Sequence, residues 1–336
     1  MTFTPQGIWV VGATFGAHYA RALQGHGLRA IIGCGGKRGR QLAKTLACDY
    51  FAGLDQALGH SRPACAVVAV RSAIVGGEGD ALARRLLQAG IPVLQELPLH
   101  PHDWVNTLRT AQHQGVRFAV TPFYDQMPTV RCFLRAARRL SLTSLLRSAE
   151  MRVSVQTLHC ALFVLSDVLG APSPSISTSP MAAPEKVLIS SNWQGIAADI
   201  VLMNRFDAAS PDDNAQPLMQ VTLLSDEGEL TLHSPFGQVI WERRLSPSDV
   251  ADNNVVLTSP LSTMPVQQDM AAAIRMTLRR FMAADAHNGA RQQRHLAVLQ
   301  LWQTICARAG HPQQRRLPPP VAIGNLLGLT DKEDEL

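Results

Sequence analysis

The feature that most limits the fold is a regular alternation of short apolar segments and amphipathic segments over the first 120 residues. The apolar segments predict five strands, at Ile8–Val11, Leu28–Ile32, Ala64–Val70, Ile91–Leu94 and Val116–Val120. Ala64–Val70 is entirely apolar, as is typical of a strand that is covered on both faces. The alternation predicts a doubly wound α/β fold with a parallel sheet, whose ligands bind beyond the carboxyl ends of the strands.

A tight glycine turn follows the first predicted strand. The sequence Gly12-Ala13-Thr14-Phe15-Gly16 leads into a segment with helical apolar spacing. This order is typical of a Rossmann nucleotide-binding domain, in which amides at the helix N-terminus hold a pyrophosphate. We therefore expect Gly12, Thr14, Phe15 and Gly16 to contact a cofactor, although Thr14 stands where the glycine pattern has its second glycine. The alternative is a strand, turn and helix that bind no ligand.

A basic, glycine-rich loop follows the second predicted strand. It contains Gly35, Lys37 and Arg38, and no carboxylate occurs from Leu28 to Arg40. Sites for NAD usually keep a carboxylate here for the ribose 2′-hydroxyl, whereas basic residues suit a 2′-phosphate. We therefore predict NADPH as the cofactor, bound in part by these three residues. A solvated loop before a helix is the alternative interpretation.

Three further segments follow predicted strands. Arg71-Ser72 comes after the third strand, Glu96–His100 after the fourth, and Thr121–Tyr124 after the fifth. Because the carboxyl ends of parallel strands meet at one edge, we expect these segments and the two glycine loops to form one rim. Arg71, Ser72, Glu96 and Pro98 are accordingly predicted to bind the cofactor.

The second half of the chain has the pattern of an α+β domain with a large open antiparallel sheet. After a predicted helix at Met127–Leu140, the apolar spacing changes to period two. The predicted strands are Leu145–Val155, Lys186–Trp193, Ala197–Phe206, Met219–Leu224, Glu229–His233 and Gln238–Arg243. Further helices are predicted at Thr157–Leu169, Val266–Ala284 and Ala290–Ala309. We expect a Rossmann domain at 1–122, an α+β substrate and dimerisation domain at 123–310, and a tail at 311–336.

Composition excludes several classes of function. Hydrophobic residues make up 46% and charged residues 17% of 336 residues, which is enough apolar material for a large core. The apolar runs are too short for a membrane span. The six cysteines have no metal-binding spacing, so we expect no metal site and reduced thiols in the cytoplasm. The net charge is +5, but the arginines are scattered and do not alternate with aromatic residues, so an acidic substrate or partner fits the charge at least as well as nucleic acid does. We expect no nucleic-acid partner.

Several motifs carry a resemblance to a known family. They are VGATFG at 11–16 with Tyr19, VRSAIVGGEG at 70–79, LQELPLHP at 94–101, and Phe123-Tyr124 leading into Pro128. On these motifs the chain resembles the thiazolinyl imine reductases, within the Gfo/Idh/MocA oxidoreductase superfamily. The resemblance is densest over residues 8–170.

This resemblance implies the NADPH-dependent reduction of a thiazoline C=N bond to a thiazolidine. The substrate would be tethered by phosphopantetheine to a carrier domain of a nonribosomal peptide synthetase in siderophore biosynthesis. The pyochelin and yersiniabactin pathways use such enzymes. A homodimer is the expected assembly.

The reaction needs a hydride at the carbon and a proton at the nitrogen. The related sugar dehydrogenases keep a lysine between the Glu and Pro of the strand-end motif, where this chain has Leu97. Tyr124 is the first candidate for the proton donor, because a phenol holds its proton at neutral pH. Its alternative role is packing at the domain junction. We also expect Glu96 to shape the nicotinamide pocket, unless it is only a buried strand-end carboxylate. His100 and His159 are further candidate donors, with helix entry as the alternative for His100.

Two other functions remain open on the sequence. The first is an NADP-dependent sugar or polyol dehydrogenase of the same superfamily, which Leu97 disfavours because the side chain cannot transfer a proton. The second is a non-catalytic NADP-binding sensor or partner protein, which Leu97 favours.

Overall fold

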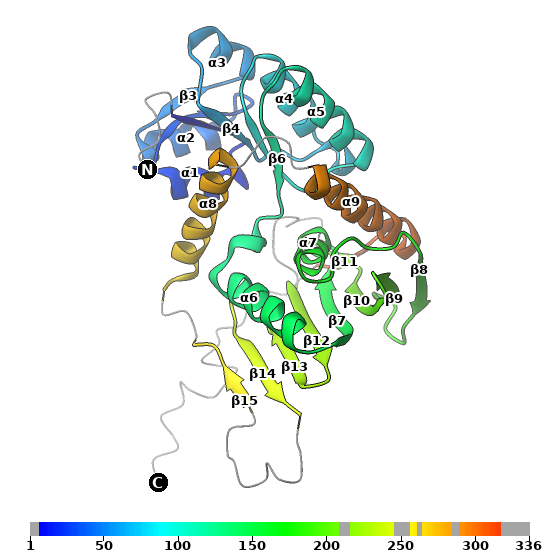
Figure 1. Ribbon diagram of the computed structural model, residues 1–336. Helices are drawn as coiled ribbons and strands as arrows, with labels where there is room; N and C mark the ends of the chain where they lie inside the picture. Colours follow the sequence, from blue (N-terminus) through cyan, green and yellow to red (C-terminus); the bar gives the residue numbers. More distant parts are fainter. Residues whose placement is uncertain (1–6, 208–215, 245–255, 261–263, 284–288, 317–336) are drawn as a thin grey trace, which may run out of the picture.

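The computed structural model of the protein describes residues 7–207, 216–244, 256–260, 264–283 and 289–316. Figure 1 shows an α/β domain built from the first part of the chain, with a larger sheet domain beside it. Two helices from the end of the described chain return to the first domain.

Within the described residues, the first sheet has six parallel strands in the order β3-β2-β1-β4-β5-β6. These are β1 (Ile8–Val11), β2 (Leu28–Ile32), β3 (Asp49–Phe51), β4 (Cys65–Val68), β5 (Val93–Glu96) and β6 (Phe118–Thr121). The parallel sheet predicted from the sequence is confirmed, with all five predicted strands present. Strand β3 was not predicted, because its three residues include Asp49 and show no apolar run.

Helices cover both faces of this sheet. They are α1 (Gly16–Leu23), α2 (Lys37–Leu46), α3 (Leu54–His60), α4 (Gly79–Gln88) and α5 (Pro101–His113), with a short 3₁₀ helix, η1 (Ala73–Val75). Gly12, between β1 and α1, has φ +105°, and a Cβ there would lie 2.6 Å from the Ala69 carbonyl oxygen. Glycine is therefore needed at this position both for its backbone conformation and for the close approach of β1 to the end of β4.

The second domain starts with η2 (Tyr124–Gln126) and α6 (Pro128–Thr143) and contains a large sheet. The part of the chain that the structure describes places eight strands in this sheet, in the order β15-β14-β13-β12-β7-β10-β9-β8. They are β7 (Leu146–Ser154), β8 (Ile176–Pro180), β9 (Lys186–Trp193), β10 (Ile196–Met203), β12 (Met219–Ser225), β13 (Gly228–Leu232), β14 (Val239–Arg243) and β15 (Val256–Thr258). A separate pair joins β11 (Arg205–Phe206) to β16 (Gln313–Gln314).

The predicted large second sheet is confirmed, but it is mixed and not antiparallel throughout, because β7 and β10 pair in parallel. The chain leaves β7, forms α7 (Leu158–Leu169), and adds β8 and β9 before it returns as β10. A crossover of this kind brings a strand back in the direction of the first. Strand β8 is not among the strands predicted from the sequence, since its Ser and Pro residues show no apolar alternation.

The last two helices return to the first domain. Helix α8 (Val266–Ala283) lies beside α1, and α9 (Gly289–Ala309) lies against α5 and α7 (Figure 1). The Arg275 guanidinium donates to the Ala22 carbonyl at 3.2 Å, and Arg117 donates to the Met282 carbonyl at 2.6 Å. These two bonds join α8 to the first domain. Helix α9 contacts α5 of the first domain and α7 of the second, so it contributes to the junction between them. The predicted tail at 311–336 is described only as far as residue 316. In the described ranges no helix has both the length and the apolar character that crossing a membrane requires.

Candidate functional site

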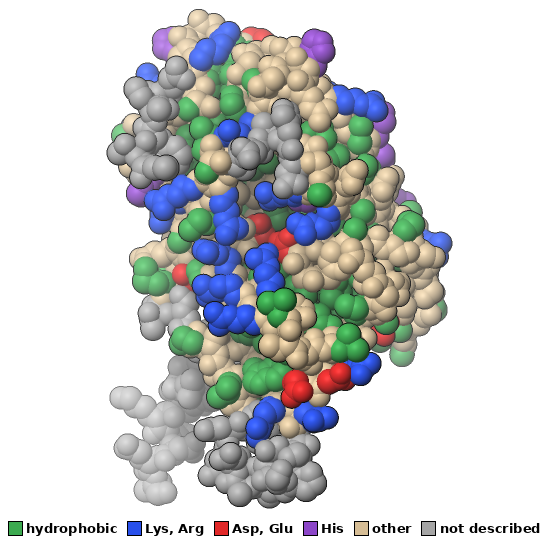
Figure 2. Space-filling view, in the orientation of Figure 1, with side chains coloured by type: hydrophobic (Ala, Val, Ile, Leu, Met, Phe, Trp, Pro, Cys, Tyr) green, Lys and Arg blue, Asp and Glu red, His purple; other side chains and the backbone are tan. Residues whose placement is uncertain are grey.

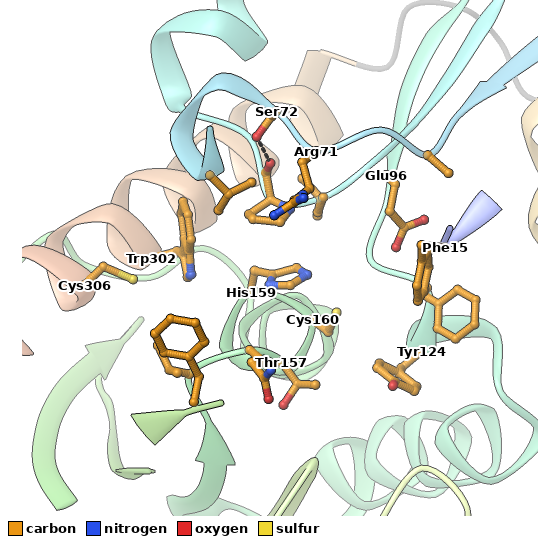
Figure 3. A pocket seen from close by; sticks show the side chains of 18 of the residues that line it. Phe15, Arg71, Ser72, Glu96, Tyr124, Thr157, His159, Cys160, Trp302 and Cys306 are labelled. Atoms are coloured by element: carbon orange, nitrogen blue, oxygen red, sulfur yellow. Dashed lines mark hydrogen bonds between the residues drawn. The ribbon is translucent and has the colours of Figure 1, made fainter. Parts of the chain in front are cut away.

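A cavity of about 560 Å³ lies at the carboxyl edge of the first sheet, where the two domains meet. Figure 3 shows that its walls come from the turn after β1, the loop after β4, the end of β5, η2, α7 and α9. Seven residues predicted to form the site line this cavity: Phe15, Arg71, Ser72, Glu96, Pro98, Tyr124 and His159. The structure therefore brings together residues from four of the five predicted rim segments.

Two hydrogen bonds and a close backbone contact fix the loop after β4. The Ser72 hydroxyl donates to the Pro98 carbonyl, which ties this loop to the end of β5. The Gly77 amide donates to the Ser72 carbonyl at 2.9 Å, and a Cβ at Gly77 would lie 2.0 Å from the Arg71 carbonyl oxygen. Only glycine permits this approach, which explains the glycines after Arg71 in the sequence. The folded loop leaves the Arg71 side chain exposed and directed into the cavity (Figure 3).

Glu96 lines the cavity from the end of β5. The Tyr19 hydroxyl donates a hydrogen bond to Glu96 Oε2. Burial raises the pKa of the Glu96 carboxyl to about 8, and the nearby carboxyl of Asp125 adds to the rise, while the bond from Tyr19 opposes it. A carboxyl with this pKa carries a proton during much of its time at neutral pH.

Tyr124 reaches the cavity from η2 and is only 6% exposed. Its ring packs edge-on against Phe123, at 5.1 Å between centroids, and against Phe236, at 6.0 Å. Burial raises the pKa of its phenol, and the Cys160 thiol and the Glu96 carboxyl raise it further. The hydroxyl of Tyr124 therefore keeps its proton at neutral pH.

The other end of the cavity is formed by residues that were not predicted from the sequence, apart from His159. Trp302 and Cys306 come from α9, Phe206 comes from β11, and Cys160 follows His159 on α7. Burial lowers the pKa of His159 to about 4, so its imidazole is neutral at pH 7. No local motif marks the α9 residues, because they reach the cavity only through the return of α9 to the domain junction.

His100 lies at the start of α5 and is absent from the described cavity lining. Its Nδ1 accepts a hydrogen bond from the His102 amide at 3.1 Å and so caps α5. Its Nε2 lies 2.9 Å from the Gln303 side-chain nitrogen of α9. The structure thus supports the helix-entry alternative for His100 and does not place it with the other candidate catalytic residues.

The two glycine loops lie next to each other, as predicted. The Arg38 guanidinium donates to the Thr14 hydroxyl at 3.0 Å, which joins the start of α2 to the turn after β1. Lys37, Arg38, Arg40 and Gln41 line an open hollow beside this contact. Gly35 has φ +86°, and a Cβ there would have no neighbour within 4 Å.

These loops have the features that a dinucleotide needs. The turn from Gly12 to Gly16 ends in α1, whose first turn carries no acidic side chain to repel a phosphate. Phe15 extends from this turn into the cavity, and Thr14 contacts the basic loop. A cofactor held by this turn would therefore reach the basic hollow at one end and the cavity at the other.

Comparisons with known proteins agree with this architecture. Residues 7–121 match the model of a family described as "Oxidoreductase family, NAD-binding Rossmann fold". A search of the curated proteins with this sequence returns no match.

Solved structures share the fold over most of the chain. A Gfo/Idh/MocA family oxidoreductase from Vibrio cholerae is 15% identical to this chain, with a TM-score of 0.68. The match covers 90% of this chain and 97% of the other. GenD2 from gentamicin A biosynthesis, in complex with NAD, is 16% identical, with 92% and 95% covered and a TM-score of 0.68. The WlbA dehydrogenase from Bordetella pertussis, in complex with NADH and UDP-GlcNAcA, is 14% identical, with 91% and 96% covered and a TM-score of 0.65. At these identities the likeness shows the fold alone.

Proposed function

We propose that the protein reduces a thiazoline C=N bond to a thiazolidine with NADPH. The match of residues 7–121 to the NAD-binding Rossmann family model supports a nicotinamide-dependent oxidoreductase. The observation that carries this proposal is the apolar, aromatic character of the cavity at the carboxyl edge of the sheet. Phe15, Phe123, Phe206 and Trp302 line it, together with Leu97 at the strand-end position.

The cavity walls suit a planar, weakly polar substrate. A site that selects a sugar must offer hydrogen-bonding partners to several hydroxyl groups, because an unpaired buried polar group is costly. Aromatic side chains instead give large contact areas to flat rings. A thiazoline ring with an aromatic substituent matches these walls better than a polyol does.

NADPH supplies the hydride when it is bound. We propose that the turn at Gly12, Thr14 and Gly16 holds the pyrophosphate, and that Gly35, Lys37 and Arg38 surround the 2′-phosphate. The bond from Arg38 to Thr14 supports this arrangement, because it fixes a guanidinium beside the turn. The nicotinamide end would then lie between Arg71, Ser72, Glu96 and Pro98, since these residues line the cavity next to Phe15.

Tyr124 is proposed to hold the substrate nitrogen. Its hydroxyl keeps its proton at neutral pH and lies in the cavity wall opposite the strand ends (Figure 3). A phenol in this position donates a hydrogen bond to a ring nitrogen and orients the C=N bond for hydride addition.

The partner proposed for the protein is the carrier domain of a nonribosomal peptide synthetase, which would deliver the substrate of siderophore biosynthesis on a phosphopantetheine arm. Figure 2 shows Lys and Arg side chains gathered over α8 and α6. Arg131 and Arg135 of α6 line a hollow against α8, and Arg279 is exposed on α8. Such a basic face suits a transient contact with an acidic domain. We propose a homodimer as the assembly.

The test is a comparison of substrates under one set of conditions. The purified protein is incubated with NADPH and 2-aryl-thiazolines, and separately with NADP⁺ and a panel of sugars and polyols. Oxidation of NADPH with formation of the thiazolidine is the expected result. Reduction of NADP⁺ by a sugar, with every thiazoline inert, would show that the protein is a sugar dehydrogenase. Tight NADPH binding without turnover of either class would show a non-catalytic protein.

A further inference from the structure

Glu96 is a carboxyl group in an apolar part of the cavity. An aromatic cluster packs on this side of it, with Phe15 and Phe123 rings 5.0 Å apart and the Tyr19 ring 6.1 Å from Phe123. The neighbouring strand-end residues Leu97 and Pro98 are uncharged and line the same cavity. A carboxylate in such surroundings loses its hydration without gaining a compensating charge.

The groups around Glu96 do not supply that charge. Tyr19 of α1 donates a neutral hydrogen bond to Oε2. Asp125 of η2 is itself a buried carboxyl, and Tyr124 and Cys160 are neutral acids that burial keeps protonated.

Two further titratable side chains line the cavity, and neither supplies Glu96 with a paired positive charge. His159 of α7 is neutral, because burial lowers its pKa to about 4. Arg71 is the one Lys or Arg among the described residues that line the cavity, and no ion pair joins it to Glu96 in the described chain. Among the residues that the structure describes, the Glu96 carboxyl therefore has one stabilising side-chain hydrogen bond and no cation paired with it.

From this placement we propose that Glu96 is the acid that protonates the substrate nitrogen, an assignment that rests on the reductase function proposed above. The O–H bond of Glu96 breaks and an N–H bond forms on the former imine nitrogen. The imine carbon receives the hydride that the reduced nicotinamide supplies, and the π electrons of the C=N bond become a new lone pair on nitrogen, which takes the proton. The C=N double bond thus becomes a C–N single bond, with one new C–H bond and one new N–H bond. The Tyr19 hydroxyl stabilises the carboxylate that remains, and the carboxylate regains its proton from water.

Glu96 suits this transfer better than Tyr124 does. A general acid works best when its pKa is near the working pH, because it then both holds its proton and releases it readily. Burial brings the pKa of Glu96 to about 8, whereas it moves the pKa of Tyr124 further from neutrality. Tyr124 thus orients the nitrogen and Glu96 supplies the proton.

The experiment measures kcat for a 2-aryl-thiazoline with NADPH between pH 5.5 and roughly 9.5. The acid form of Glu96 is required, so kcat of the wild type should be constant at low pH and fall as the pH rises through about 8. Glu96→Gln should lower kcat by roughly 10²- to 10³-fold and remove the fall above pH 8. Glu150→Gln, an exposed glutamate on β7, is the matched control and should behave as the wild type.

Tyr19→Phe tests the same assignment without removing the acid. Loss of the hydroxyl removes a bond that favours the carboxylate, so the fall in kcat should move to a higher pH. This result separates proton transfer from a structural role of Glu96, and it is available even if Glu96→Gln does not fold.

Infrared difference spectra give a readout that is independent of turnover. The wild type should show a protonated carboxyl band that disappears on titration through about pH 8 and is missing from Glu96→Gln. Three results overturn the assignment: an unaltered kcat in Glu96→Gln, a pH profile that Tyr19→Phe leaves unchanged, or the absence of that band. A wild type that reduces no thiazoline contradicts the proposed function as well, whereas an active Glu96→Gln contradicts this inference alone.

Discussion

At the scale of the residue, burial determines which side chains of the candidate site are neutral at pH 7. Glu96, Tyr124 and His159 line one cavity, and burial makes each of them neutral at pH 7. A site of this kind holds several proton donors but little charge. Such a site is suited to bind an uncharged ring and to protonate one of its atoms.

Substitution of Tyr124 by Phe tests its orienting role. Loss of one hydrogen bond to the substrate nitrogen should lower kcat/KM roughly tenfold, since such a bond contributes about 1.4 kcal/mol. The pH at which kcat falls should stay near that of the wild type. A loss of more than about 10³-fold, together with the disappearance of the pH dependence, would instead make Tyr124 the proton donor.

The pKa of Glu96 also predicts how stability depends on pH. The carboxyl titrates near 4.5 when it is unfolded and at about 8 in the folded protein. A raised pKa contributes stability that is complete below the unfolded value and is lost as the pH rises through the folded value. Melting temperatures of the wild type should therefore fall relative to those of Glu96→Gln between about pH 5 and pH 8. Parallel curves would show that Glu96 is already ionised.

Some residues of the candidate site could be predicted from the sequence and others could not. Glu96 and Tyr124 follow strands, so the geometry of parallel sheets was enough to bring them to one rim. His100 also follows a strand, but its side chain turns back to cap α5, and no sequence pattern distinguishes the two orientations. Trp302 is far from the rim in sequence and reaches it only through the packing of α9.

At the scale of the element, we propose that the loop after β2 and the start of α2 select NADPH over NADH. Lys37→Ala with Arg38→Ala removes two cations beside the glycine turn. We expect KM for NADPH to rise roughly 100-fold, because each charge-assisted bond contributes about 1.5–3 kcal/mol, with KM for NADH nearly unchanged. Lys44→Ala, an exposed lysine later in α2, is the control. Equal changes for both cofactors would mean that this loop does not contact the 2′-phosphate.

The glycine-rich loop after β4 makes a second prediction at this scale. Gly77→Ala would place a Cβ 2.0 Å from the Arg71 carbonyl oxygen, so the loop must shift. We expect a loss of roughly 1–3 kcal/mol in the free energy of unfolding, together with a lower kcat/KM. Gly59→Ala, within α3 and with no atom within 4 Å of its Cβ, should instead stabilise the protein by about 0.5–1 kcal/mol. Urea unfolding of the two variants measures both effects, and equal losses would refute the steric explanation.

At the scale of the whole molecule, the sequence was enough to predict the order of most strands and helices. It was not enough to predict how all of them pair and pack. The alternation of strands and helices was enough to predict the parallel sheet, and the change to period two predicted most strands of the second sheet. The parallel pairing of β7 with β10 depends on how α7, β8 and β9 cross the sheet, which apolar spacing does not encode. The return of α8 and α9 to the first domain is likewise a matter of tertiary packing.

The transfer of a labelled hydride shows whether the protein reduces a thiazoline with NADPH. The protein is incubated with NADPH that carries deuterium at the transferable C4 position and with a 2-aryl-thiazoline, and the products are analysed by mass spectrometry. We expect a thiazolidine with one deuterium on the carbon of the former C=N bond and an equal amount of NADP⁺. Recovery of unreacted thiazoline and labelled NADPH, while a sugar reduces NADP⁺ in the same preparation, would show that the protein is not a thiazoline reductase.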